Sequence, residues 1–264
     1  MRLLFLGDVV GRPGRRAIAA ILPRLAARAG VDFVVANCEN ASGGKGIDPR
    51  SAEELHDAGV DMLTSGNHIW QKREVLPYLR ESGRLLRPLN FAPGTPGVGW
   101  AIGKARRSKT SVGVINLIGR VFMGPADCPF RAVDEVLPHV RREATVILVD
   151  MHGEATSEKV GMGRFLAGRV SVVVGTHTHV QTADETVFPG GTAYLTDAGM
   201  CGPEDSVIGV KTSQVLERFL TQMPVRFDVA TGPVIVQGAL VDVDEVTGQA
   251  TAIERVQERW ADES

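Results

Sequence analysis

Three short apolar runs in the first 66 residues decide the fold: LLFLG (Leu3–Gly7), FVVAN (Phe33–Asn37) and MLTSG (Met62–Gly66). Each run has the length of a buried strand and ends at polar or glycine residues. Two stretches with helical spacing, Arg15–Ala29 and Pro49–Ala58, lie between the runs. This alternation predicts parallel strands joined by crossover helices.

The two helical stretches carry expectations of their own. Asp48 is a suitable N-cap for the second helix, and Pro49 suits its first turn. Pro23 lies inside the first helical stretch, so we expect it to kink or break that helix.

The rest of the chain predicts a mixture of parallel and antiparallel strands. We expect strands at Thr145–Met151, Val170–Gly175, Thr192–Thr196, Val225–Ala230, Val234–Val243 and Ala250–Val256, and a hairpin of Val98–Ile102 with Ser111–Leu117. Helices are expected at Arg131–Arg142, Ser157–Leu166 and Thr212–Leu220. Together these elements predict an α/β protein with two mixed sheets packed face to face, outer helices, and one domain over residues 1–264.

The composition is typical of a soluble globular protein, with 44% hydrophobic and 23% charged residues among 264. The net charge of −2 provides no global basic field for nucleic acid, and 5% aromatic residues argue against a base-stacking platform. The three cysteines show no CxxC spacing, and no apolar run approaches the ~18 residues that span a bilayer. We therefore expect a cytoplasmic protein without a membrane partner.

Five of the predicted strands are each followed by side chains that bind metals or transfer protons. These residues are Asp8, Glu39, Asn40, Asn67, His68, His152, His177 and His179, and they include four of the six histidines in the chain. Because ligand sites form where the carboxyl ends of parallel strands converge, we expect these side chains to share one site.

The donor types in this set indicate a transition-metal site. Carboxylates, carboxamides and imidazoles without a thiolate suit Mn, Fe or Zn better than Ca or Mg. The set is too large for one metal and about enough for two. Two metals about 3.5–4 Å apart are an arrangement used for displacement at phosphorus.

Five motifs resemble one family when they are taken together and in order. They are GDVVG (Gly7–Gly11), NCEN (Asn37–Asn40), GNHIW (Gly66–Trp70), HGEATSEK (His152–Lys159) and THTHVQTADE (Thr176–Glu185). This set resembles the YmdB-like branch of the calcineurin-like metallophosphoesterases. The resemblance implies a four-layer α/β/β/α sandwich and a binuclear metal-dependent phosphodiesterase. The implied substrates are cyclic nucleotides (2′,3′-cyclic or 3′,5′-cyclic) or RNA-derived diesters, attacked in line by a hydroxide that bridges the metals.

The resemblance also implies a role for each strand-end residue. Asp8, Glu39, Asn40 and His179 would hold the first metal. Glu39 would bridge to a second metal, which Asn67, His152 and His177 would also hold. His68 would act as general acid toward the leaving oxygen or stabilise the transition state. The implied cofactors are two divalent or trivalent transition-metal ions, Fe or Mn, with Zn also admissible.

Three positions depart from the wider superfamily while matching the YmdB-like pattern. Val10 stands where a histidine is usual, Glu39 replaces the usual bridging aspartate, and Ile69 stands where an acidic residue is common. These changes leave the identity of the metal open. The carbonyl oxygen of Asn40 would fill the position of the missing imidazole.

Three other functions remain to be weighed against this one. A non-catalytic nucleotide-sensing or RNA-regulatory protein could use the same metal site. A dinucleotide-binding domain is disfavoured because Gly7, Gly11 and Gly14 do not form GxGxxG and Asp8 would repel a pyrophosphate. An amidohydrolase barrel is disfavoured because its His-x-His pair comes early in the chain. RNA and a second copy of the chain stay open as partners.

Several polar residues have both an ordinary and a functional interpretation. Arg12 and Lys45, the latter in the loop ASGGKGI (Ala41–Ile47), are either solvated or close to a bound phosphate. Asp197 ends a strand, where it could support the site. The remaining expectations are structural: Glu154 and Glu158 at a helix start, His56 and His139 on helices, and Cys38 in the core.

Overall fold

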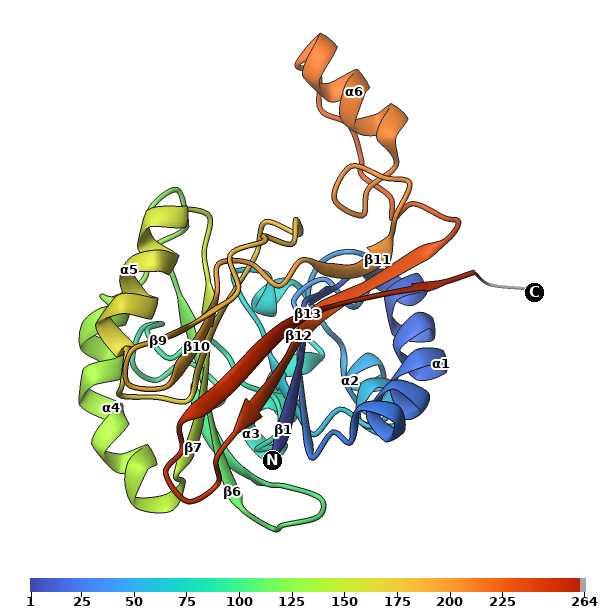
Figure 1. Cartoon of the computed structure of the whole chain (residues 1–264). Helices are drawn as coiled ribbons and strands as arrows, with labels where there is room; N and C mark the ends of the chain where they lie inside the picture. The colour runs from blue at the N-terminus through green and yellow to red at the C-terminus, as the bar shows by residue number, and fades with distance from the viewer. Residues whose placement is uncertain (262–264) are drawn as a thin grey trace.

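Two β-sheets lie face to face, and helices cover the outer face of each (Figure 1). The computed structural model describes residues 1–261. Three apolar cores separate the four layers. One core joins helices to the first sheet, one lies between the sheets, and one joins the second sheet to its own helices. The four-layer α/β/β/α prediction is confirmed.

The first sheet has seven strands in the order β2-β11-β12-β1-β3-β4, with β13 paired to β12. The strands are β1 (Arg2–Leu6), β2 (Asp8–Val9), β3 (Phe33–Asn37), β4 (Met62–Thr64), β11 (Met200–Pro203), β12 (Val234–Val243) and β13 (Ala250–Trp260). β1, β3 and β4 run parallel, whereas β12 pairs antiparallel with β1. The parallel register brings the carboxyl ends of β1, β3 and β4 to one edge of the sheet.

The second sheet has six strands in the order β5-β6-β7-β8-β10-β9. The strands are β5 (Trp100–Lys104), β6 (Ser111–Ile118), β7 (Val146–His152), β8 (Val172–Thr176), β9 (Thr186–Phe188) and β10 (Thr192–Leu195). β6, β7, β8 and β10 are parallel, and β5 and β9 are antiparallel at the two edges. Both sheets are therefore mixed, and β5 with β6 forms the predicted hairpin.

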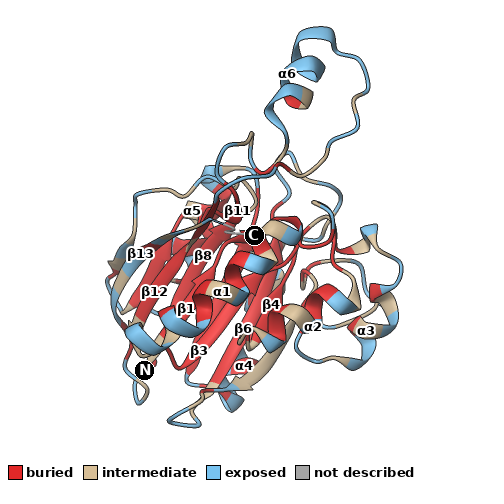
Figure 2. Cartoon of the chain, turned by 90° about the vertical axis from the view of Figure 1, so that its right-hand side faces the viewer, coloured by how far each residue is buried: buried red, intermediate tan, exposed pale blue. Residues whose placement is uncertain are grey.

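Five helices supply the two outer layers. The first sheet is covered by α1 (Gly11–Ala29), α2 (Pro49–Asp57) and α3 (Val75–Glu81), and the second by α4 (Pro129–Glu143) and α5 (Thr156–Leu166). A short 3-10 turn, η1 (Ile69–Gln71), follows β4. The sixth helix, α6 (Thr212–Thr221), stands away from the layers and is largely exposed, in contrast to the buried strands (Figure 2).

Two sequence expectations about these elements need correction. Pro23 does not break helix α1, because the buried face of the helix, including Ile21 and Leu25, packs against the sheet on both sides of the proline. Residues Val225–Ala230 form no strand. This segment returns from α6 outside both sheets, and Val229 makes only an isolated bridge to Val210.

The expected cap of α2 is confirmed, and five elements were not predicted. The Asp48 side chain accepts a hydrogen bond from the backbone N–H of Ser51 and caps α2. The sequence did not predict β2, η1, α3, β9 or β11. The expectation of one domain over residues 1–264 stays a prediction. Within the part of the chain that the structure describes, no helix has the length and apolar character needed to cross a membrane.

Candidate metal centre

The eight strand-end residues named from the sequence lie together. They lie at or just after the carboxyl ends of β1, β3, β4, β7 and β8, so both sheets contribute to one cluster. Contacts between their polar atoms connect all eight. The joined pairs are Glu39–His152, Glu39–His68, Asn67–His152, His177–His152, His177–Asp8, Asn40–His179 and Asn40–His68. The order of the strands thus brings together residues separated by up to 171 positions in the chain.

One part of the cluster centres on the Nε2 atom of His152. This atom lies 3.2 Å from Glu39 Oε2, 3.1 Å from His177 Nδ1 and 3.3 Å from Asn67 Oδ1. One donor atom each from Glu39, His152 and His177 fall within 4.8 Å of one another. Two ring nitrogens and two oxygens that face one point form a donor set suitable for a transition metal.

The other part of the cluster contains Asp8, Asn40 and His179. His179 Nε2 lies 3.2 Å from Asn40 Oδ1 and 3.9 Å from Asp8 Oδ1. Asp8 is fully buried, and its Oδ1 atom has no hydrogen-bond partner within residues 1–261. A buried carboxylate oxygen without a partner is costly, and a cation at this point would satisfy it.

Burial and charge act against each other in the cluster. Burial would raise the pKa of Glu39, but His152 and His68 outweigh this effect and hold the pKa well below its usual value. Burial would lower the pKa of His152, but Glu39 and Asp8 raise it to about 9. Burial and the charge of His152 lower the pKa of His177 to about 3. The buried carboxylates thus hold a positive charge at the centre, which a proton on His152 or a metal ion can provide.

A buried carboxylate behind the cluster orients His152. Asp150 accepts hydrogen bonds from Thr64 Oγ1 at 2.5 Å, Thr176 Oγ1 at 2.7 Å and Asn37 Nδ2 at 2.9 Å. Because the Thr176 hydroxyl donates to Asp150, it accepts from His152 Nδ1 at 2.9 Å. This arrangement turns His152 Nε2 toward the donor cluster, as outer hydrogen bonds commonly do for metal-binding histidines. The sequence analysis missed Asp150, although a lone carboxylate in the apolar run VILVDMH was a usable signal.

A buried ion pair fixes the loop that carries His177 and His179. Both histidines have positive φ angles, 103° and 64°, which are uncommon for residues other than glycine. Asp197 accepts hydrogen bonds from Thr178 N at 3.2 Å and Thr178 Oγ1 at 2.7 Å. Lys159 Nζ lies 2.8 Å from the same carboxylate. Asp197 therefore contacts the loop between the two histidines and not their ring atoms.

Glu154 has a role beyond the predicted helix start. Its Oε2 atom lies 3.1 Å from His177 Nε2, while His177 Nδ1 faces the cluster. A carboxylate on the outer nitrogen fixes the orientation of an imidazole. Lys45, by contrast, is exposed on its loop.

The glycine before Asn67 is required by close packing. A Cβ atom on Gly66 would lie 2.1 Å from Glu39 Oε2 and 2.2 Å from His152 Nε2. No side chain fits between these two groups, so a residue without a Cβ lets the loop approach them.

Comparisons with known proteins find similar sequences and structures that cover nearly the whole chain. A 2′,3′-cyclic-nucleotide 2′-phosphodiesterase of Bacillus subtilis is 44% identical over 97% of this chain and 96% of its own length. A crystal structure of a hypothetical protein from Thermus thermophilus is 43% identical with a TM-score of 0.92, covering 98% of this chain and 99% of that one. A crystal structure of a novel phosphatase from Mycoplasma pneumoniae is 33% identical with a TM-score of 0.92, covering 100% of this chain and 95% of that one. A model of the YmdB-like protein family matches residues 4–256, and the chain belongs to that family.

Proposed function

We propose that this chain is a binuclear metal-dependent phosphodiesterase that hydrolyses 2′,3′-cyclic nucleotides. The observation that carries the proposal is the buried Asp8 Oδ1 atom, which has no hydrogen bond to any residue from 1 to 261 and lies beside a second donor group centred on His152 Nε2. The chain is a phosphoric diester hydrolase, in keeping with its family and its 44% identical relative.

The donor set divides between two metal positions. Asp8, Asn40 and His179 would hold one cation, and Asn67, His152 and His177 would hold the other. The Glu39 carboxylate lies against His152 on one side and His68 on the other, and it would contribute to both positions. Nitrogen and oxygen donors without a thiolate favour Mn, Fe or Zn. When bound, the two ions stabilise negative charge on the phosphoryl oxygens and lower the pKa of a coordinated water.

His68 lies at the edge of the donor set and serves the leaving group. Its Nδ1 atom is 3.0 Å from Glu39 Oε1, so a proton on Nδ1 is held by that carboxylate. The Nε2 atom would then be available to the substrate, where it would stabilise or protonate the departing ribose oxygen. Such proton transfer contributes about 10²–10⁴-fold to a rate.

The substrate class follows from the name of the Bacillus subtilis relative, a 2′,3′-cyclic-nucleotide 2′-phosphodiesterase. Two metal ions at this site would stabilise the charge on the phosphoryl oxygens of such a cyclic diester. Cleavage by water at the 2′ oxygen leaves the phosphate on the 3′ oxygen and returns one proton to the 2′ oxygen.

The direct test is turnover of 2′,3′-cyclic AMP and 3′,5′-cyclic AMP by metal-free protein reconstituted with Mn, Fe or Zn. We expect hydrolysis of the 2′,3′-cyclic substrate that a chelator abolishes and added metal restores. Tight binding of the cyclic nucleotide without turnover under every metal condition would instead indicate a nucleotide sensor.

A further inference from the structure

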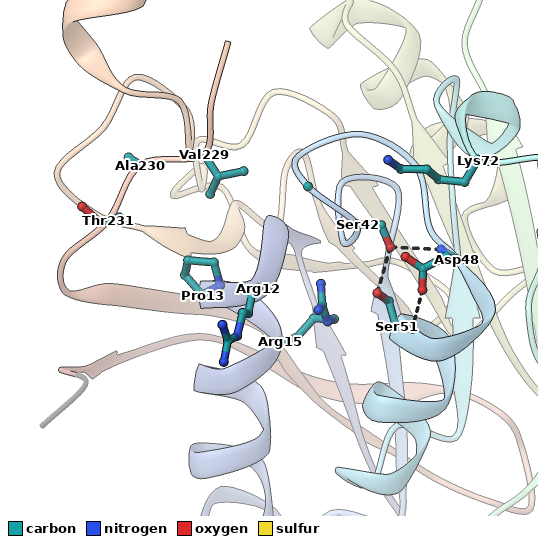
Figure 3. A pocket seen from close by; sticks show the side chains of 11 residues that line it. Arg12, Pro13, Arg15, Ser42, Asp48, Ser51, Lys72, Val229, Ala230 and Thr231 are labelled. Atoms are coloured by element: carbon teal, nitrogen blue, oxygen red, sulfur yellow. Dashed lines mark hydrogen bonds between the residues drawn. The ribbon is translucent and has the colours of Figure 1, made fainter. Parts of the chain in front are cut away.

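A cavity that contains none of the proposed metal ligands lies close to the metal centre in the sequence of loops. It has a volume of about 410 Å³ and is lined by the first turn of α1, the loop after β3, the start of α2 and the segment after η1. Figure 3 shows Arg12 and Arg15 on one side of this cavity and Lys72 reaching in from the other. Asp48 supplies an acidic group to its wall.

The positive charge of this cavity is only partly neutralised. Arg15 Nε pairs with Glu54 at 2.8 Å, and an Asp48 oxygen accepts the Ser51 backbone N–H at 2.8 Å. The side chains of Arg12 and Lys72 have no hydrogen bond or ion pair with any residue from 1 to 261. Two unpaired cations from separate segments that face one cavity would bind an anion, and phosphate oxygens are suitable acceptors.

One loop separates the cavity from the metal centre. The backbone N–H of Gly11, the residue before Arg12, donates to Asn40 O at 2.8 Å. Asn40 Nδ2 donates to Gly44 O at 2.9 Å. Lys72 follows His68 by four residues. Arg12 is thus next to a residue that is hydrogen-bonded to Asn40, and Lys72 lies on the same short segment as His68.

We propose that this cavity binds the phosphate on the 5′ oxygen of the ribose whose 2′ and 3′ oxygens carry the scissile cyclic diester. The inference rests on the proposed function. A cyclic diester occupies both of those oxygens, so the next phosphate along a nucleic acid chain is joined to the 5′ oxygen of the same ribose. The preferred substrate is accordingly the 3′ end of a short RNA with a terminal 2′,3′-cyclic phosphate. A net charge of −2 agrees with a local phosphate contact rather than binding along a long duplex.

The experiment compares kcat/KM for three substrates on the Mn-loaded enzyme. They are 2′,3′-cyclic AMP, adenosine 2′,3′-cyclic phosphate with a 5′-phosphate, and a dinucleotide that ends in a 2′,3′-cyclic phosphate. We expect the dinucleotide to exceed cyclic AMP by about 10-fold or more, as charge-assisted contacts to one phosphate allow. The 5′-phosphorylated mononucleotide carries the phosphate without a second nucleoside. Its kcat/KM therefore shows whether the phosphate alone is enough or the RNA chain is also needed.

Removal of the unpaired cations tests which residues cause the preference. Arg12→Ala with Lys72→Ala should return the ratio of dinucleotide to cyclic AMP to about one. The dependence of log KM on log salt should become less steep by about one for each cation removed. Arg24→Ala and Arg73→Ala remove exposed cations outside the cavity and should keep the wild-type ratio.

Each outcome of this comparison has one meaning. A wild-type ratio near one, or a ratio that survives loss of both cations, overturns the inference and leaves the proposed phosphodiesterase intact. A preference for the 5′-phosphorylated mononucleotide over the dinucleotide overturns the choice of RNA. No turnover of any substrate overturns the proposed function itself.

Discussion

His68 and Glu39 meet at two points. The backbone N–H of His68 donates to Glu39 Oε2 at 3.2 Å, and the ring Nδ1 atom lies 3.0 Å from Glu39 Oε1. The carboxylate proposed to bridge the two metals therefore also fixes the position and orientation of the proposed general acid. In the proposed mechanism, this one buried side chain would couple metal binding to proton transfer.

Replacement of His68 should separate these two roles. His68→Gln should reduce kcat on a poorly activated diester by about 10²–10⁴-fold, the range for loss of a general acid. Metal content measured by elemental analysis should not change, because Asp8, Asn67 and the other proposed ligands remain. His139→Gln on the exposed face of α4 is the control. Full activity of His68→Gln would exclude the proposed role.

The hydroxyl of Thr176 should affect metal affinity without being a ligand. Thr176→Val removes the acceptor for His152 Nδ1 and one donor to Asp150. Loss of such an orienting contact typically weakens metal binding by about 10–100-fold. Thr176→Ser retains the hydroxyl and should recover most of the affinity in a competitive chelator titration. Equal affinities for all three proteins would show that this contact does not orient His152.

A methyl group on Gly66 should disrupt the centre while every proposed ligand is retained. Gly66→Ala places its Cβ 2.1 Å from Glu39 Oε2 and 2.2 Å from His152 Nε2, which forces these groups apart. We expect reduced metal content and loss of activity. Gly124→Ala is the matched control, since its Cβ would meet nothing within 4 Å. Normal metal content in Gly66→Ala would contradict the packing described for the loop.

His56 should make folding sensitive to acid. Burial lowers its pKa from the usual 6.5, and its Nδ1 atom donates to Val60 O at 2.8 Å. Since the unfolded chain takes up the proton first, the stabilisation is complete above about pH 6.5 and decreases as the pH falls toward the depressed folded pKa. Thermal unfolding of metal-free His56→Gln between pH 7.5 and 5 should show a smaller loss of Tm than wild type.

The matched control for this pH dependence is the exposed histidine on α4. His139→Gln should follow the wild-type curve, because no buried group is removed. A His56→Gln curve parallel to that of wild type would mean that other groups cause the acid sensitivity.

The sequence predicted the residues of the candidate metal centre better than the residues that orient them. Strand-end positions of Asp8, Glu39 and His152 could be read directly, because parallel strands must place their carboxyl ends at one edge. Asp150 was missed because two of its partners, Asn37 and Thr64, lie 113 and 86 positions away, and only the packing of the two sheets brings them to it. A lone carboxylate in an apolar strand signals that a partner exists, but it does not identify that partner.

Local patterns also misled where tertiary contacts outweighed them. Pro23 did not end α1, because the buried face of that helix packs on the sheet along its length. The alternation in Val225–Ala230 resembled a strand, but the segment finds no sheet edge beside α6. Secondary-structure propensity depends only on the residues of a segment, so it does not predict which other elements will pack against that segment in the fold.

The metal content of the purified chain after reconstitution with Mn tests the central claim most directly. Elemental analysis should find about two ions per wild-type chain, and clearly fewer in Asp8→Ala and in Glu39→Ala, which removes the proposed bridge. Binding of no more than one ion by wild type, or unchanged content in both variants, would contradict the account.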